Sequence, residues 1–459
     1  MSSHKGYRSL KFGVLFLALL AIFPLGLLLR STPVLRKPFW IVFGALPFFA
    51  AAIPLFDVGL LSWAGRWVGF VYGLQISIVD ILAAAALFAM PRGKLPWWCK
   101  LPFLLYLLAT ALSLLQAAEP VAASFGLLQF ARIYLVMVVV ARACADPDVP
   151  FLMLKGMAIG MAAHFVAVLH QRFQLQLPQT MGLFIHQNTL GMAAHFVLFP
   201  HLALLLAGYR NVRYLVGTVL ATIVVVVFTA SRAAVGFAVI GLGTLFVTQA
   251  LAGLTQRKMA VGLAALASLL IVAPLAVSTF SNRFELSPLG ESQYDERAAF
   301  NRAASFILED YPLGVGINHY VHVARDLGYS ERGGVIGFEG NRNNIVHNAY
   351  WLTAAEAGYP GVIAFCIMLV VPLFVAIRTG WRMRRTLEGN LLLGFGVALL
   401  VVYLHSFYEW VIFAREIQYL LTMTMGMVFG IALRLRVRDR ARQPRSIQAM
   451  QLNAQSGLR

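Results

Sequence analysis

Residues 214–252 read YLVGTVLATIVVVVFTASRAAVGFAVIGLGTLFVTQALA, two apolar runs with one charged residue, Arg232, between them. A helix needs about 20 apolar residues to cross the hydrocarbon core of a bilayer. The runs 214–229 and 233–252 are close to that length, and the segment that joins them is long enough only for a tight turn. This stretch therefore predicts a helical hairpin inside a membrane.

The rest of the chain has the same character. Of its 459 residues, 60% are hydrophobic and 12% are charged, and a soluble domain carries about twice that charged fraction. This composition excludes a soluble globular enzyme, a disordered chain and a disulfide-rich secreted domain. Further apolar segments predict the following candidate spans: 12–29, 38–56, 67–90, 101–117, 125–142, 151–171, 183–206, 259–277, 349–376, 391–410 and 416–434.

We therefore expect an all-α polytopic membrane protein with about 12 transmembrane helices, drawn from 12–13 candidate spans. Thirteen spans would place the N-terminus outside, whereas Lys5, Arg8 and Lys11 favour the inside. We therefore expect that one of the first two Pro-interrupted segments, 12–29 or 38–56, does not fully cross, which gives twelve spans. The chain divides into four parts: an N-terminal transmembrane bundle at 1–277 with about 9–10 spans, a large external loop at 278–346, C-terminal transmembrane helices at 347–434 and a basic tail at 435–459.

The net charge of +18 and the pI of about 10.2 would suggest nucleic acid in a soluble protein. Here the basic residues lie in short loops and the tail, all on one side if the spans alternate: 92–100, 210–213, 257–258, 378–385 and 434–445. Basic loops mark the cytoplasmic side. We thus expect contact with anionic membrane lipid and no nucleic-acid partner.

The loop at 278–346 lies on the opposite side and contains nine of the chain's 19 acidic residues, together with six arginines. Long loops are usually functional. Residues 294–308 lack Pro and Gly and have apolar residues at helical spacing, which predicts one or two surface helices that end at Tyr311-Pro312. We expect the chemistry of the protein on this face.

His347 lies where this loop re-enters the membrane, in the sequence His347-Asn348-Ala349. A histidine at that boundary can titrate near neutrality and act as a base. The alternative is an interfacial histidine beside an aromatic belt. Asn348 can orient a substrate or simply cap the following helix.

Arg232 lies in an external turn, where positive charge is not expected and where burial without an anion is costly. Its planar guanidinium suits phosphate oxygens, although the residue could also be an anchor for lipid headgroups. The sequence His186-Gln187-Asn188 starts another span on the same side. It would face the same vestibule or serve as a helix cap.

Arg297 and Arg302 lie in the predicted loop helix, five residues apart and so on different faces. Neighbouring acidic residues could neutralise both as surface ion pairs. Arg132, inside a predicted span, is either a paired structural charge or a residue on a substrate path.

The chain resembles the bacterial O-antigen ligase and polymerase superfamily, most closely the lipopolysaccharide O-antigen ligases, from about Gly182 to Glu416. Four pieces occur in the order of that family: Gly182-Leu183-Phe184-Ile185-His186-Gln187-Asn188, Ser231-Arg232, Arg297 before Pro312-Leu313-Gly314-Val315-Gly316, and His347-Asn348 before Glu356 and Gly358.

The resemblance implies a metal-independent, GT-C-like glycosyltransferase of the inner membrane, with its active site facing the periplasm and its C-terminus in the cytoplasm. Its donor would be a glycan on undecaprenyl diphosphate and its acceptor lipid A-core, with no metal or other cofactor. The roles carried over are a catalytic base for His347, donor diphosphate binding for Arg232, Arg297 and Arg302, and substrate positioning for Asn348, His186, Asn188 and Glu356. We predict a single displacement with inversion at the anomeric carbon.

Three other functions stay open. O-antigen polymerases often carry an arginine, ten residues and a glycine in their loops, and the arginines of the loop at 278–346 lack that spacing, which favours the ligase. A protein O-oligosaccharyltransferase would use the same donor. A lipid or solute transporter would also suit charges inside a membrane, but here the suspicious groups gather on one external face.

Overall fold

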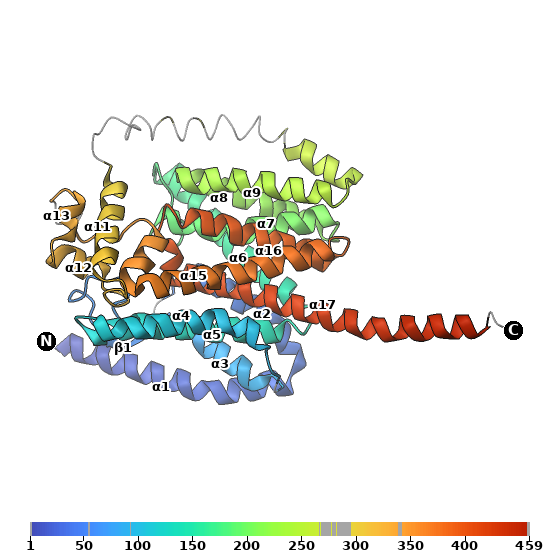
Figure 1. Cartoon of the computed structure of the whole chain (residues 1–459), viewed down its shortest axis with the longest axis horizontal. Helices are drawn as coiled ribbons and strands as arrows, with labels where there is room; N and C mark the ends of the chain where they lie inside the picture. The colour runs from blue at the N-terminus through green and yellow to red at the C-terminus, as the bar shows by residue number, and fades with distance from the viewer. Residues whose placement is uncertain are drawn as a thin grey trace.

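The computed structural model describes residues 2–53, 56–91, 93–265, 267, 277, 281, 295–337 and 342–456, with side chains between residues 12 and 438 of these ranges. This part of the chain is mostly helical, and its long helices lie side by side (Figure 1). The helices are α1 (Ser2–Ser31), α2 (Arg36–Ala45), α3 (Ile78–Ala89), α4 (Trp97–Ser113), α5 (Pro120–Ala143), α6 (Val149–Leu169), α7 (Gln187–Ala207), α8 (Val212–Phe228), α9 (Arg232–Leu251), α11 (Glu296–Asp310), α12 (Tyr320–Asp326), α13 (Tyr329–Gly333), α15 (Ala349–Arg382), α16 (Leu387–His405) and α17 (Arg415–Ser456).

Within the described residues, nine helices have a segment long and apolar enough to cross a membrane: α1, α4, α5, α6, α7, α9, α15, α16 and α17. The helices α3 and α8 are apolar but shorter. Helices satisfy their own backbone hydrogen bonds, as a chain surrounded by lipid requires. The predicted all-α membrane protein is thus confirmed in its general class.

The helix α7 lies at the centre of the bundle, where almost all of it is buried. It packs against α6, α8, α9, α16 and α17. It approaches α16 closely at Gly394, where an added Cβ would come within 2.6 Å of the Cβ of Ala203 and 2.9 Å of the carbonyl oxygen of Phe199. Small residues at such contacts let membrane helices approach closely.

The first 90 residues differ from the predicted spans. In the described part of the segment over 38–56, the ten-residue α2, about 15 Å long, is followed by a 3-10 turn, Leu46–Phe49. This agrees with the expectation that one of the first two Pro-interrupted segments does not fully cross. The span predicted over 67–90 is wrong in its first half, because Gly73–Ser77 forms strand β2, which pairs antiparallel with β1 (Asp57–Ser62). The helix α3 begins only at Ile78, because Ser77 and Asp80 form a capping box.

The external loop contains α11, α12 and α13. The helix α11 confirms the one predicted over 294–308, with Asp295 as its N-cap and Tyr311 as its C-cap before Pro312. Arg332 of α13 donates a hydrogen bond to Asp310 at 3.0 Å, which joins the two helices. Residues 278–280 and 282–294 of this loop, and residues 266 and 268–276 of the span predicted over 259–277, lie outside the described residues.

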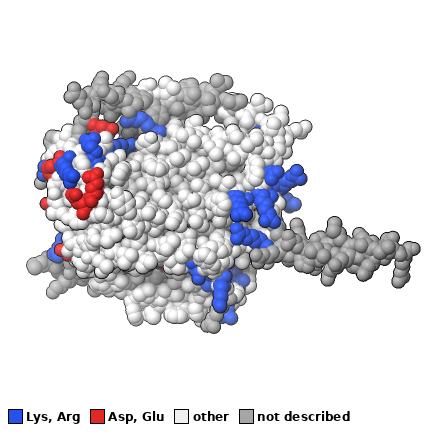
Figure 2. Space-filling model, viewed as in Figure 1, with Lys and Arg blue, Asp and Glu red and all other residues white. Residues whose placement is uncertain are grey.

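Charged side chains gather at the two ends of the bundle and leave a broad uncharged belt between them (Figure 2). Lys and Arg predominate at the end from which α17 projects, and acidic and basic side chains mix around α11, α12 and α13. We call these the basic end and the loop end. The helix α1 starts at the loop end (Figure 1), so the N-terminus lies opposite the C-terminus and not on the side that Lys5, Arg8 and Lys11 favoured.

Candidate functional site

The carboxylate of Glu409 joins three of the predicted site residues. Glu409 lies in the short turn between α16 and α17, and its side chain is 2% exposed. Its Oε1 accepts hydrogen bonds from Asn188 Nδ2 at 2.7 Å and from Arg297 Nη2 at 2.8 Å. Its Oε2 lies 3.2 Å from Nδ1 of His347. One carboxylate thus connects the start of α7, the loop helix α11 and His347, which lies two residues before α15. We call Glu409, Asn188, Arg297 and His347 the Glu409 cluster.

His347 is held in this cluster by contacts between the start of α15 and the end of α16. The backbone N–H of Ala349 donates to the carbonyl of Ser406 at 2.9 Å. The ring of Tyr350 stacks on that of Phe407, with centroids 4.2 Å apart. Both contacts join neighbours of His347 to the turn that carries the Glu409 carboxylate, so the imidazole and the carboxylate are positioned by packing on both sides.

The electrostatics of the cluster favour an ionised Glu409. Burial by itself would raise the pKa of this carboxyl, but the hydrogen bond from His347 and the charges of His347 and Arg297 outweigh it and lower the pKa below the ordinary 4.5. The nearby His186 is the N-cap of α7 and accepts a hydrogen bond on Nδ1 from the backbone of Asn188 at 3.2 Å. Burial lowers the pKa of His186, so this ring is neutral at pH 7.

This arrangement sets the chemistry that His347 can perform. An ionised carboxylate only accepts hydrogen bonds, so Nδ1 of His347 must carry the proton that faces Glu409. In the neutral ring Nε2 then carries the lone pair, and the side chain is 28% exposed. Glu409 and His347 therefore resemble pairs in which a carboxylate contacts Nδ1 of a histidine and the other ring nitrogen acts as a general base. The guanidinium of Arg297 is 48% exposed beside it and offers positive charge at the same place.

Arg232 lies at the same end of the bundle, as the first residue of α9. The turn before it holds Ala230 at φ 49°, a left-handed conformation that costs a non-glycine residue about 1–2 kcal/mol. Further along α9, Phe237 packs on Tyr408, with ring centroids 5.7 Å apart. Tyr408 precedes Glu409, so the first turns of α9 lie beside the cluster. The strained turn at Ala230 sets the position of the backbone of Arg232 at the start of α9.

Three other predicted residues make contacts outside the cluster. Arg302 donates from Nε to the carbonyl of Gly333 at 3.0 Å and so holds α13 against α11. The side chain of Asn348 caps α15, because its Oδ1 accepts hydrogen bonds from two backbone amides of the first turn at 2.9 and 3.1 Å. Glu356 is buried and accepts from the backbone of Tyr320 at 3.0 Å. These contacts join parts of the loop end to each other.

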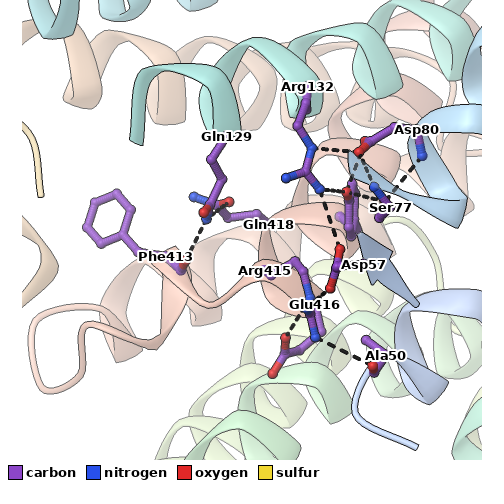
Figure 3. Close-up of polar contacts among 11 residues, drawn as sticks. Ala50, Asp57, Ser77, Asp80, Gln129, Arg132, Phe413, Arg415, Glu416 and Gln418 are labelled. Atoms are coloured by element: carbon purple, nitrogen blue, oxygen red, sulfur yellow. Dashed lines mark hydrogen bonds and ion pairs between the residues drawn. The ribbon is translucent and has the colours of Figure 1, made fainter. Parts of the chain in front are cut away.

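A second polar group lies inside the bundle and surrounds Arg132 (Figure 3). Its guanidinium contacts Asp80 at 2.5 Å, the hydroxyl of Tyr419 and, at 3.8 Å, Asp57. Tyr419 also donates to Asp80 at 2.9 Å and lies 2.6 Å from the hydroxyl of Ser77. Arg132 is therefore a paired structural charge and not a free residue on a substrate path. Its contacts join α5 to strand β1, to α3 and to α17.

This second group also fixes the far side of the turn that carries Glu409. Arg415, the first residue of α17, pairs with Asp57 of strand β1. Gln129 of α5 donates to the carbonyl of Phe413 at 3.2 Å and to Gln418 at 2.5 Å (Figure 3). The turn between α16 and α17 is thus held on one side by the Glu409 cluster and on the other by buried ion pairs.

No family model matches this chain, and no curated protein matches it either. Within the described residues, no group of three or more His, Cys, Asp or Glu side chains is placed to hold a metal ion. The geometry of the Glu409 cluster and the sequence pattern are the features of this chain that indicate a function.

The sequence analysis missed Glu409 itself. It placed residue 409 inside a span over 391–410, whereas α16 ends at His405 and the carboxylate lies in the external turn that follows. A signal was present, because Glu409 is an acidic residue between two apolar runs on the same face as Arg232. The criterion that selected Arg232, a charge in a short external turn, would also have selected Glu409.

Proposed function

We propose that this chain transfers a glycan from undecaprenyl diphosphate to lipid A-core, the reaction of an O-antigen ligase. The observation that supports the proposal best is the hydrogen-bonded pair of His347 and Glu409 beside the half-exposed Arg297. A base, a carboxylate that orients it and a cation are the groups that transfer from a glycosyl diphosphate requires.

The proposed step is a single displacement. An acceptor hydroxyl oxygen attacks the anomeric carbon and forms the new glycosidic bond, while the bond from that carbon to the diphosphate oxygen breaks. The hydroxyl proton passes to Nε2 of His347, and the electron pair of the broken bond leaves with undecaprenyl diphosphate. Glu409 stabilises the imidazolium that forms, as carboxylates do in comparable dyads. Attack opposite the leaving group inverts the anomeric configuration.

The leaving group is a polyanion, so its stabilisation is a large electrostatic demand. We assign this role to Arg297, whose exposed half is available for a planar contact with phosphate oxygens, and to Arg232 at the same end of the bundle. In this mechanism the arginines supply the positive charge, and no metal or other cofactor takes part. His186 and Asn188 would position the donor at the start of α7.

We further propose that the loop end faces the periplasm and that the basic end and the C-terminus lie in the cytoplasm. The gathering of Lys and Arg at the basic end supports this orientation through the positive-inside rule (Figure 2). The bundle would then be a GT-C-like enzyme of the bacterial inner membrane with about 12 spans.

The test is transfer by the purified full-length chain in proteoliposomes, with labelled undecaprenyl-diphosphate glycan as donor. Three acceptors are supplied separately: lipid A-core, a second lipid-linked repeat and a peptide rich in Ser and Thr. Label on lipid A-core supports the proposal. Growth of lipid-linked repeats alone would make the chain a polymerase, and label on the peptide alone would make it a protein O-oligosaccharyltransferase. Movement of donor across the bilayer without covalent change would make it a transporter.

The arginine assignments are tested in the same assay. We expect Arg232→Ala and Arg297→Ala to weaken the use of donor while protein abundance is preserved. A matched control is Arg325→Gln, an arginine of the same loop whose guanidinium contacts Asp326 and Asn343. Loss of folded protein in either arginine variant, with the control intact, would favour a structural role instead.

A further inference from the structure

A cavity lies at the basic end, away from the Glu409 cluster. It has a volume of about 1350 Å³ and is lined by the ends of α1, α3 and α5, the starts of α2 and α6, and the later part of α17. Pockets for small ligands usually occupy roughly 300–1,000 Å³. This cavity therefore has room for something larger than a small polar metabolite.

The floor of the cavity is apolar. Leu29, Trp40, Ala86, Leu95 and Val149 line it, and each is less than a tenth exposed. These side chains come from five different segments, so the floor is part of the packed interior of the bundle. A floor of this kind suits hydrocarbon.

The rim of the cavity is cationic. Five basic residues line it against one acidic residue, Asp146: Arg30, Arg36, Lys94, Arg142 and Arg434. Three of these cations are already engaged, because Arg36 donates to backbone carbonyls at the end of α1, Arg142 contacts the carbonyl of Pro91, and Arg434 pairs with Glu388 at 3.0 Å.

The other two cations, Arg30 and Lys94, are exposed at the mouth of the cavity. In the part of the chain that the structure describes, neither of them pairs with a carboxylate. The cavity thus combines a buried hydrocarbon-like floor with two cations at the level where the helices end. That level is where lipid headgroups lie, and basic pockets between membrane helices bind anionic headgroups.

We propose that this cavity binds an anionic glycerophospholipid, with its phosphate between Arg30 and Lys94 and an acyl chain on the apolar floor. The shape distinguishes a lipid from free phosphate, because a phosphate ion would use the rim and leave the floor empty. The site goes beyond glycosyl transfer and does not depend on it, since it lies at the other end of the bundle.

The test uses the full-length chain in bilayers of phosphatidylcholine with or without phosphatidylglycerol, and it measures lipid retained by native mass spectrometry and the thermal midpoint. We expect wild type to retain phosphatidylglycerol and to unfold at a higher temperature in its presence. The double variant Arg30→Gln, Lys94→Gln should retain about 25-fold less phosphatidylglycerol than wild type, because the loss of each cation should weaken binding roughly fivefold. The control Arg385→Gln, an exposed arginine of the basic end outside the cavity, should behave as wild type.

A second variant keeps the charges and fills the floor. Ala89→Trp, at the half-buried end of α3, should reduce retention of phosphatidylglycerol because its ring occupies the space of the acyl chain. Inorganic phosphate alone should leave the thermal midpoint of wild type unchanged. Equal retention of both lipids, full retention in the double variant, full retention in Ala89→Trp, or an equal effect of inorganic phosphate would each overturn the proposal.

Discussion

Replacement of Glu409 by glutamine tests the cluster more sharply than removal of any predicted residue. The carboxylate accepts hydrogen bonds from Asn188 and Arg297 and faces Nδ1 of His347. Glutamine has almost the same shape but only one oxygen, so its NH₂ must face one of these donors. Where it faces His347, Nδ1 becomes an acceptor and the ring proton moves to Nε2. The imidazole then cannot take a proton from the acceptor hydroxyl.

The expected cost follows from the role of the base. A positioned general base contributes about 10²–10⁴ in rate, and a wrong histidine tautomer in a serine protease costs about 10⁴. The ring of His347 is 28% exposed and can reorient, so we expect the lower part of this range. For Glu409→Gln we predict that kcat falls by about 10²–10³, or about 2.7–4.1 kcal/mol in the barrier, with KM for the donor nearly unchanged.

The assay is transfer from undecaprenyl-diphosphate glycan to lipid A-core at saturating donor, with folded protein measured in parallel. The matched control is Glu296→Gln, which removes the carboxylate next to Arg297 on α11. The double variant Glu409→Gln, His347→Ala should be no slower than His347→Ala alone, because residues that act as a unit are not additive. A Glu409→Gln enzyme with more than half the wild-type kcat, or additive losses in the double variant, would refute the reasoning.

Three further predictions concern stability and pH. Arg302→Gln should leave transfer unchanged and lower the free energy of unfolding by about 0.5–1 kcal/mol, because one part-buried hydrogen bond to Gly333 is lost; thermal unfolding and the transfer assay check both. Arg132→Met should destabilise the protein by about 3–5 kcal/mol because it leaves Asp80 as an unpaired buried charge, and a second change, Asp80→Asn, should recover part of the loss in midpoint. The pKa of Glu409 is lowered on folding, so its stabilisation is present above about pH 4.5 and is lost as the pH falls through the lower folded pKa; the midpoints of wild type and Glu409→Gln should therefore converge in acid.

Apolar periodicity was sufficient to predict the long helices, because length and composition alone decide whether a segment can cross a membrane. It failed where an apolar segment is not one helix. Residues 67–90 read as a span, yet the capping box of Ser77 and Asp80 starts the helix eleven residues later than expected. The spacing of Ser77 and Asp80 is visible in the sequence, and the strand before it is fixed by pairing with Asp57–Ser62, which no local pattern reveals.

Three of the four residues of the Glu409 cluster could be selected from the sequence, but Glu409 itself and the geometry of the cluster could not. His347, Arg297 and Asn188 were selected for their side of the membrane, and the structure brings all three to one carboxylate. Arg302 was selected on the same grounds, but it lies on another face of α11 and bonds to Gly333. The five-residue spacing of Arg297 and Arg302 is enough to predict that they lie on different faces of the helix. Their partners, Glu409 and Gly333, lie more than 30 residues away in the chain, so local sequence does not predict them.

The most direct test of the central claim is a single-turnover measurement of glycan transfer by wild type and His347→Ala in the same proteoliposomes. The account predicts that wild type moves the glycan to lipid A-core with inversion, and that His347→Ala is slowed by about 10² or more at equal folded abundance. Transfer by His347→Ala at the wild-type rate, or a glycosyl-enzyme intermediate trapped on the wild-type protein, would contradict it.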